Sequence, residues 1–236
     1  MTFTVIARDE EKGLLGIAIS TSGLSVGARC PFIRANVGAV SSQAFTDPGI
    51  GPIALELLGL GLSPTKVLID LSQSDPHHAY RQIGMVDRHG RAAVHTGANA
   101  MTCRGHVTGP NYLVMGNHLK SDQVVEDMNR AFLGSKGQLL EDRLLKAVTA
   151  GRDAGGDLDG HRTACMLVYD TEPYARTDLR VDFVPKTTSG PDAVDALTAL
   201  LDKYRPLIPY YKVRPHNPTI AGWLDWLKER GAPFHD

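Results

Sequence analysis

Residues 2–20, TFTVIARDEEKGLLGIAIS, predict a β-hairpin with two buried strands. Apolar and β-branched residues fill 2–8 and 14–20, and the charged DEEKG between them is typical of a turn. A strand with one wet face would alternate cleanly between apolar and polar side chains, and neither of these does. The chain therefore begins with strands that need cover on both faces.

Further along the chain, blocks of predicted strands alternate with pairs of predicted helices. Turn residues separate the strands, and apolar residues spaced three or four apart mark the helices. The predicted strands cover residues 34–43, 80–87, 91–96, 111–118, 163–170 and 178–184. The predicted helices cover residues 52–60, 138–152 and 191–204, and two more begin at the N-cap residues Ser63 and Ser121.

This order of elements favours a layered α+β fold. Strict alternation of strands and helices would indicate a parallel sheet, whereas hairpins separated by helix pairs indicate antiparallel sheets. Two such sheets that pack face to face, with a helix pair outside each, would cover both faces of the apolar strands. We expect a four-layer αββα sandwich over residues 1–188, followed by a C-terminal helix and tail over residues 189–236.

The composition excludes several classes of protein. The chain has 236 residues, 42% of them hydrophobic, so it can bury a sizeable core without metal or disulfide staples. Its 25 Lys and Arg nearly balance its 26 Asp and Glu, and the net charge of −1 gives no field to attract nucleic acid or a membrane. Three widely spaced cysteines, with no secretory leader and no long apolar run, indicate a cytoplasmic protein.

Thr2 is the first candidate for a catalytic residue. Because the residue after Met1 is small, removal of Met1 would leave Thr2 with a free α-amine at the start of a buried strand. Such an amine titrates near about 7.7–8.0, so at neutral pH it can accept the proton of the threonine hydroxyl. One residue would then supply both nucleophile and base. Many chains begin with Met and a small residue for translational reasons alone, which is the non-catalytic alternative.

The segment SSQAFTDPGIG, residues 41–51, places polar side chains between a strand and a helix. Gln43 and Thr46 could bind a substrate there, and backbone N–H groups could bind an oxyanion. Turn formation and helix capping explain the same residues equally well. The glycines of this segment match a dinucleotide-binding pattern, but one predicted helix follows another here, so no βαβ unit is expected.

Residues 95–106, HTGANAMTCRGH, hold His95, Thr96 and His106. Either histidine could line a substrate pocket, and a hydrogen-bonded structural histidine is the alternative. The cysteines and histidines lack the paired spacing of a tetrahedral zinc site, so we predict no metal and no cofactor. A metal-dependent hydrolase built on His95, His106 and Asp157 is kept as a third hypothesis.

Four other side chains suit an active site. Asn117 ends a predicted strand, where its amide could donate to an oxyanion or simply cap a turn. The Gly-Gly-Asp turn of DAGGDLDG, which lacks the oxygen ligands of a calcium loop, could direct its own Asp157 or the following Arg162 into a site, or be an ordinary loop between a helix and a strand. Arg81 or Arg162 would orient a substrate carboxylate through two parallel hydrogen bonds.

The C-terminal tail, residues 203–236, interleaves Lys and Arg with Tyr204, Tyr210, Tyr211, Trp223 and Trp226. Such interleaving can stack nucleic-acid bases. Exposed aromatic side chains in this number are more typical of an association surface. We expect the tail to dock on the domain or to join two copies of the chain into a homodimer.

Five motifs, in order, resemble the bacterial and archaeal family known as domain of unknown function 1028. They are TFTVIARD, VGAVSSQAFTDPGIGPIALELL, YRQIGMVDRHGRAAVHTG, RGH with VMGNHL and VVEDMNRAF, and AGGDLDGHRTACMLV, and they span residue 2 to about 185. That family belongs by fold to the N-terminal nucleophile hydrolases, so the resemblance implies hydrolysis of an amide or another C–N bond. Thr2 takes the position of the superfamily's nucleophile.

Other residues match recurrent polar positions of the family that have no established role. They are Gln43, Thr46, Arg81, Gln82, His95, Thr96, His106, Asn117 and Asp157. One motif departs from the family, which commonly has Gly-x-Gln-Ser after the Gly-Gly-Asp turn, where this chain has His161-Arg162-Thr163. An arginine at that point could select a carboxylate-bearing substrate or mark a diverged specificity.

The main hypothesis is a hydrolase of a small amide, ureide or imide. Thr2 would attack the carbonyl carbon, and backbone N–H groups with Asn117 would stabilise the oxyanion. The substrate would contact Gln43, Thr46, Arg81, His95, Thr96, His106, Asp157 and Arg162. The rival hypothesis is a non-catalytic small-molecule-binding or assembly module, because a fold alone does not fix a function.

Overall fold

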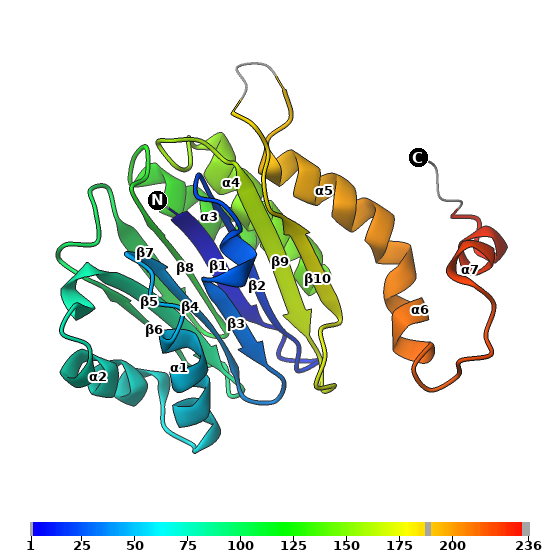
Figure 1. The fold of residues 1–236 in the computed structure, drawn as a ribbon, viewed down its shortest axis with the longest axis horizontal. Coiled ribbons are helices and arrows are strands. Elements are labelled where there is room, and N and C mark those ends of the chain that lie inside the picture. Colours follow the sequence, from blue (N-terminus) through cyan, green and yellow to red (C-terminus); the bar gives the residue numbers. More distant parts are fainter. Residues whose placement is uncertain (1, 187–189, 233–236) are drawn as a thin grey trace.

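Two antiparallel sheets form the centre of the computed structural model, which describes residues 2–186 and 190–232 (Figure 1). The larger sheet contains β1 (Thr2–Arg8), β2 (Leu15–Thr21), β7 (Gly105–Gly109), β8 (Tyr112–Asn117), β9 (Thr163–Tyr169) and β10 (Thr177–Val181), in the order β10-β9-β2-β1-β8-β7. The smaller sheet contains β3 (Pro31–Arg34), β4 (Gly38–Ala44), β5 (Arg81–Asp87) and β6 (Ala92–Thr96), in chain order. The predicted combination of helices with two antiparallel sheets is confirmed.

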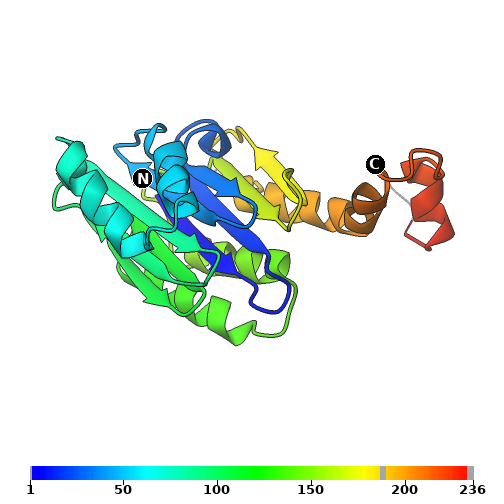
Figure 2. The same ribbon diagram turned by 90° about the horizontal axis from the view of Figure 1, so that it is seen from below.

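Helices contact both sheets. α1 (Ile50–Gly59) and α2 (Pro64–Ser74) pack on the smaller sheet, while α3 (Gln123–Gly134), α4 (Leu140–Asp153) and α5 (Ala193–Tyr204) pack on the larger one. Figure 2 shows α1 and α2 on the opposite side of the strands from α3 and α4. As predicted, Ser63 caps α2, with its hydroxyl accepting the Lys66 N–H at 3.3 Å and Pro64 in the first turn.

Three apolar clusters hold these elements together. Because side chains alternate along a strand, β1 sends Phe3 and Val5 to one face and Ile6 to the other. The first cluster lies between the larger sheet and its helices and includes Phe3, Val5, Met128, Phe132 and Leu144. The second lies between the smaller sheet and its helices and includes Val40, Ile83, Val67 and Leu71. The third draws on both sheets and includes Ile6, Ile17, Val86, Leu113 and Met115.

Several element boundaries differ from the prediction. The strand expected over 34–43 is two strands, β3 and β4, because the chain turns between them with Asn36 at φ +59°. β7 was not predicted, since its sequence GHVTG is short, polar and rich in glycine. Ser121 does not cap α3. The N-cap residue is Asp122, and no side chain caps that helix among the described residues.

The C-terminal segment is more closely packed than expected. Its α5 belongs to the core, because Val194, Leu197 and Leu201 are buried against the larger sheet. α6 (Ile208–Val213) and α7 (Trp223–Glu229) form a small cluster of their own around Leu207, Tyr210 and Leu227, with Trp223 and Trp226 packed against it. Tyr210 is thus buried within the tail itself, whereas Tyr211 remains 42% exposed. The expected boundary between residues 188 and 189 falls at residues outside those described.

No helix in the described part of the chain is long and apolar enough to span a membrane.

Candidate functional site

One end of the space between the two sheets is polar. Here the alternation that points Ile6 into the third cluster also points Thr2 and Thr4 towards the smaller sheet. Gln43 on β4 and Gln82 on β5 face them from that sheet, as their hydrogen bonds to the larger sheet show. All four side chains are buried. Polar groups in such a place need hydrogen-bond partners, because burial without one is costly.

Thr2 begins β1 and lies opposite Asn117 of β8 in the strand register. Its hydroxyl donates to the hydroxyl of Thr21 at 3.3 Å, and Thr21 donates in turn to Asp157 Oδ2 at 3.4 Å. Both contacts are longer than a usual O–H···O bond of about 2.5–3.0 Å. The Asp157 carboxylate is 3% exposed and is fixed by the Ser22 N–H at 2.8 Å. Two successive hydrogen bonds thus connect the Thr2 hydroxyl through Thr21 to the buried Asp157 carboxylate.

Gln82 connects the two sheets at this end. Its Oε1 accepts an N–H from Gln43 at 2.8 Å and another from Asn117 at 3.0 Å. Its Nε2 lies 3.0 Å from Thr96 Oγ1, and 3.2 and 3.0 Å from backbone carbonyl oxygens of β7 and β8. Gln82 is fully buried, so these contacts satisfy its amide completely.

Gln43 extends the same network to β1. Its Oε1 accepts the Thr4 hydroxyl at 2.6 Å, and its Nε2 lies 3.5 Å from the carbonyl oxygen of Thr2. Five of the residues expected from the sequence are therefore neighbours here: Thr2, Gln43, Thr96, Asn117 and Asp157.

His106 joins the network at the surface. Its Nδ1 lies 2.9 Å from Thr96 Oγ1, and the ring is otherwise exposed. The part of the imidazole that is buried against Thr96, together with the nearby His95, lowers the pKa of His106 below its ordinary value. A neutral ring can then either donate to the threonine hydroxyl or accept from it, depending on the tautomer.

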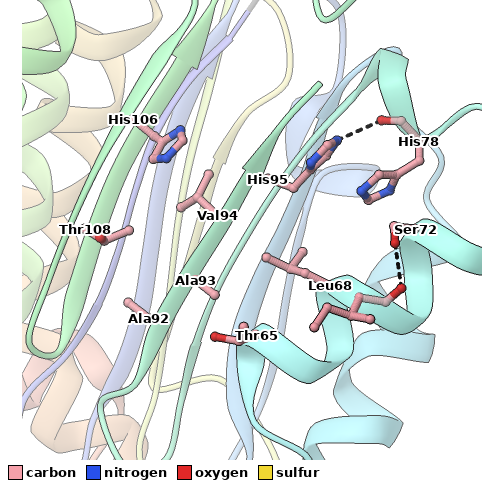
Figure 3. A pocket seen from close by; sticks show the side chains of 11 residues that line it. Thr65, Leu68, Ser72, His78, Ala92, Ala93, Val94, His95, His106 and Thr108 are labelled. Carbon is pink, nitrogen blue, oxygen red and sulfur yellow. Dashed lines mark hydrogen bonds between the residues drawn. The ribbon is translucent and has the colours of Figure 1, made fainter. Parts of the chain in front are cut away.

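The side chain of His95 lies on the opposite face of β6 from that of Thr96. Its Nε2 is 2.9 Å from the carbonyl oxygen of His78, and the two imidazole rings stack with centroids 3.6 Å apart. A groove of about 460 Å³ runs along β6 between α2 and β7, and all three histidines line it (Figure 3). Figure 3 shows His106 on one side of this groove and His78 and His95 on the other. The structure thus places His95 in the groove rather than in the network around Thr2.

Three more of the expected substrate-binding residues lie outside the network. Arg81 precedes Gln82 on β5, so its side chain faces the helix side of the sheet, where it pairs with Asp75 at 2.9 Å. The Thr46 hydroxyl contacts the Cys30 sulfur at 3.7 Å. In the described part of the chain, neither side chain shares a contact with Thr2.

Arg162 lies closer to the candidate nucleophile. Its backbone N–H donates to the carbonyl oxygen of Thr21 at 2.9 Å. Its buried Nε has no hydrogen-bond partner among the residues that the structure describes. Such an atom is a donor that a bound anion could use.

The metal-dependent alternative does not fit this geometry. Asp157 contacts Thr21 and Ser22, whereas His95 faces α2 from the far side of the smaller sheet. Within residues 2–186 and 190–232, no group of three His, Cys, Asp or Glu side chains is arranged to hold a metal ion. The three residues proposed as ligands are therefore not brought together.

The sequence pattern predicts no role for Thr4, Thr21 or Gln82. Each is a polar residue within or at the end of an otherwise apolar strand, TFTVIAR, LGIAIST or RQIGMVD. A buried polar residue in a core strand is informative because it needs a partner. The sequence shows these polar residues in apolar strands, but it does not show their hydrogen-bond partners, which come from other strands.

Comparison with known proteins identifies relatives of unknown activity. Residues 2–189 match the model of DUF1028, described as a family of unknown function. The crystal structure of protein SPO2555 from Silicibacter pomeroyi, assigned to the same family, superposes with a TM-score of 0.77 at 30% identity, covering 95% of this chain and 89% of that one. Anbu (ancestral beta-subunit) from Yersinia bercovieri aligns over 93% of this chain and 98% of its own, at 11% identity and a TM-score of 0.40, a likeness too distant to support an argument. No curated protein matches the chain significantly.

Proposed function

The chain belongs to the DUF1028 family, whose function is unknown, and we propose that it is an N-terminal nucleophile hydrolase. In this proposal its sheets and helices form the four-layer αββα sandwich of that superfamily. The observation that carries the proposal is the position of Thr2. It begins a central strand, faces the polar space between the sheets, and directs its hydroxyl through Thr21 towards the Asp157 carboxylate.

The proposed reaction needs only residue 2 as nucleophile and base. Removal of Met1, a residue outside those described, would free the α-amine of Thr2. The Thr2 Oγ attacks the substrate carbonyl carbon while the α-amine takes the hydroxyl proton, and the amine later returns a proton to the leaving nitrogen. Water then hydrolyses the acyl-enzyme ester. Asn117, held by Gln82 at 3.0 Å, is positioned beside Thr2 as a donor to the oxyanion.

The proposed substrate is a small amide, ureide or imide that bears a carboxylate. Arg162 supports this choice, since its backbone binds Thr21 and its buried Nε has no protein partner among the described residues. Arg81 is less suited because Asp75 already neutralises it. A guanidinium binds a carboxylate through two parallel hydrogen bonds, which would fix the scissile carbonyl relative to Thr2.

Two measurements test this function. Intact mass of the protein from its native host shows whether Met1 is removed, and full retention of Met1 would refute the mechanism. Ammonia or amine release is then measured over a panel of carboxylate-bearing amides, ureides and imides. We expect Thr2→Ala to abolish turnover, Thr2→Ser to keep part of it, and Thr108→Ala, an exposed threonine on β7, to leave it unchanged. Turnover by Thr2→Ala at the wild-type rate would favour another nucleophile, and binding without turnover would favour the non-catalytic module.

The proposal also covers the cellular compartment and the oligomeric state of the protein. Cys30, Cys103 and Cys165 are free thiols, which suits the reducing cytoplasm. We further propose a homodimer through the C-terminal helices, where Tyr211 and Leu224 remain 42% and 55% exposed beside the small cluster of α6 and α7. Light scattering that gives the mass of a monomer would contradict this assembly.

A further inference from the structure

A second cavity lies at the other end of β1 from Thr2. It measures about 430 Å³ and is lined by the turn after β1, the turn before β8, the end of α3 and the start of α4. Arg8, one of its residues, closes the strand that Thr2 opens, and the two are therefore about 20 Å apart at 3.3 Å per residue. The cavity shares no residue with the network around Thr2.

Arg143 on α4 is the unusual side chain of this cavity. Its guanidinium carbon lies 4.1 Å from the centre of the Phe132 ring, and its buried Nε has no hydrogen-bond partner among the described residues. Burial lowers the pKa of Arg143, and the nearby Asp9 only partly offsets this effect. An arginine stays charged in proteins, so a buried face without a partner costs free energy unless something else supplies acceptor oxygens.

Four basic and three acidic side chains line the cavity, so the basic ones exceed the acidic ones by one. Arg8, Lys12 and Lys136 line it with Arg143, and in the described part of the chain none of the four takes part in an ion pair.

Three carboxylates also line the cavity, and two of them are already engaged. Asp9 Oδ1 accepts the backbone N–H groups of Glu11 and Lys12, each at 3.0 Å, and so holds the turn. Glu10 accepts the side-chain amide of Asn111 at 3.4 Å. Asp9 and Glu10 therefore stabilise the rim of the cavity, and in the described part of the chain the Arg143 guanidinium feels the charge of Asp9 without forming an ion pair with it.

We propose that this cavity binds a small organic anion, whose carboxylate or phosphate oxygens pair with the Arg143 guanidinium. Two N–H donors on one planar group match two oxygens of either anion. The apolar part of the ligand lies against Leu133, which is 51% exposed at the cavity wall. Lys136, on the exposed rim, adds attraction at longer range.

Isothermal titration calorimetry of the full chain tests this site with two probes, benzoate and inorganic phosphate. We expect saturable binding of at least one, weakened tenfold or more in Arg143→Gln. The matched control is Arg130→Gln, since Arg130 pairs with Asp127 on the exposed surface of α3 and should not affect binding. Binding of benzoate alone identifies a carboxylate site, binding of phosphate alone a phosphate site, and binding of both a general oxyanion site.

A second variant separates binding from folding. Arg143 covers Phe132, so Arg143→Gln could disturb packing, whereas Lys136 is exposed and Lys136→Gln should fold normally. Circular dichroism checks the fold of each protein. We expect Lys136→Gln to weaken binding severalfold, and more so at low ionic strength. The proposal is overturned if neither probe binds the wild type, or if a folded Arg143→Gln binds as tightly as the wild type; if Arg143→Gln does not fold, unchanged binding by Lys136→Gln at low ionic strength overturns it.

Discussion

Replacing Gln82 by methionine should destabilise the protein severely, although the two side chains have nearly the same length. Gln82 is fully buried and makes five hydrogen bonds that join β5 to β4, β6, β7 and β8. Methionine would leave the amide groups of Gln43 and Asn117 without their shared acceptor. A buried polar group left unpaired costs about 1–3 kcal/mol. With two such groups, we expect a loss of about 2–6 kcal/mol in the free energy of unfolding.

Urea unfolding followed by circular dichroism measures this loss. A domain near the middle of the usual range, about 10 kcal/mol, would still be folded without denaturant, so the variant can be compared with the wild type. Gln123→Met is the matched control, because Gln123 lies on the surface of α3 and its side chain donates to Asp127 one turn away. It should change stability by less than about 0.5 kcal/mol. A loss below about 1 kcal/mol in Gln82→Met would refute the view that this residue secures the two sheets.

Two further predictions concern buried or capped carboxylates. Arg176→Met should lower the free energy of unfolding by about 3–5 kcal/mol, because Glu141, only 1% exposed, loses its ion pair at 2.8 Å. An unchanged midpoint of urea unfolding would contradict this. Burial opposes ionisation of Asp192, but its hydrogen bonds to a histidine and to the N-terminus of α5 prevail and lower its pKa to about 2. Because the unfolded value is about 3.9, the stability from this carboxylate is lost as pH falls from about 4 to 2, and Asp192→Asn should show a shallower loss there.

The sequence predicted the main elements of the fold but not how the strands pair. The β1–β2 hairpin, α2 with its Ser63 cap, and the β9–β10 hairpin follow from local patterns of apolar residues and turns. β7 could not be predicted in the same way, because GHVTG has little strand preference of its own. It is a strand because β8 offers an unpaired edge beside it, which is a property of the tertiary structure.

The residues of the candidate site could also be predicted only in part, because their orientation depends on how the strands pair. Thr2 and Asn117 were predicted as nucleophile and oxyanion donor because they stand at strand ends. The register of β1 with β8 places them opposite each other. Arg81 and His95 are next to residues that face Thr2, yet alternation along β5 and β6 turns both to the helix side. A motif in the sequence does not reveal which face of a strand is buried against the other sheet.

The composition of the network bears on how Thr2 could act as its own base. Hydroxyls and neutral amides supply the hydrogen bonds around Thr2, and burial among neutral groups favours the uncharged form of an amine. The ionisable side chains nearby are Asp157, His106 at the surface end of the network, and Arg162, whose backbone binds Thr21. The Asp157 carboxylate has the opposite effect, since it favours the protonated form, but Thr21 stands between it and Thr2. A lysine or arginine in the network would not be needed for proton transfer. The proposed chemistry thus depends on where the first strand begins, which explains why no Ser-His-Asp pattern or zinc motif marks it in the sequence.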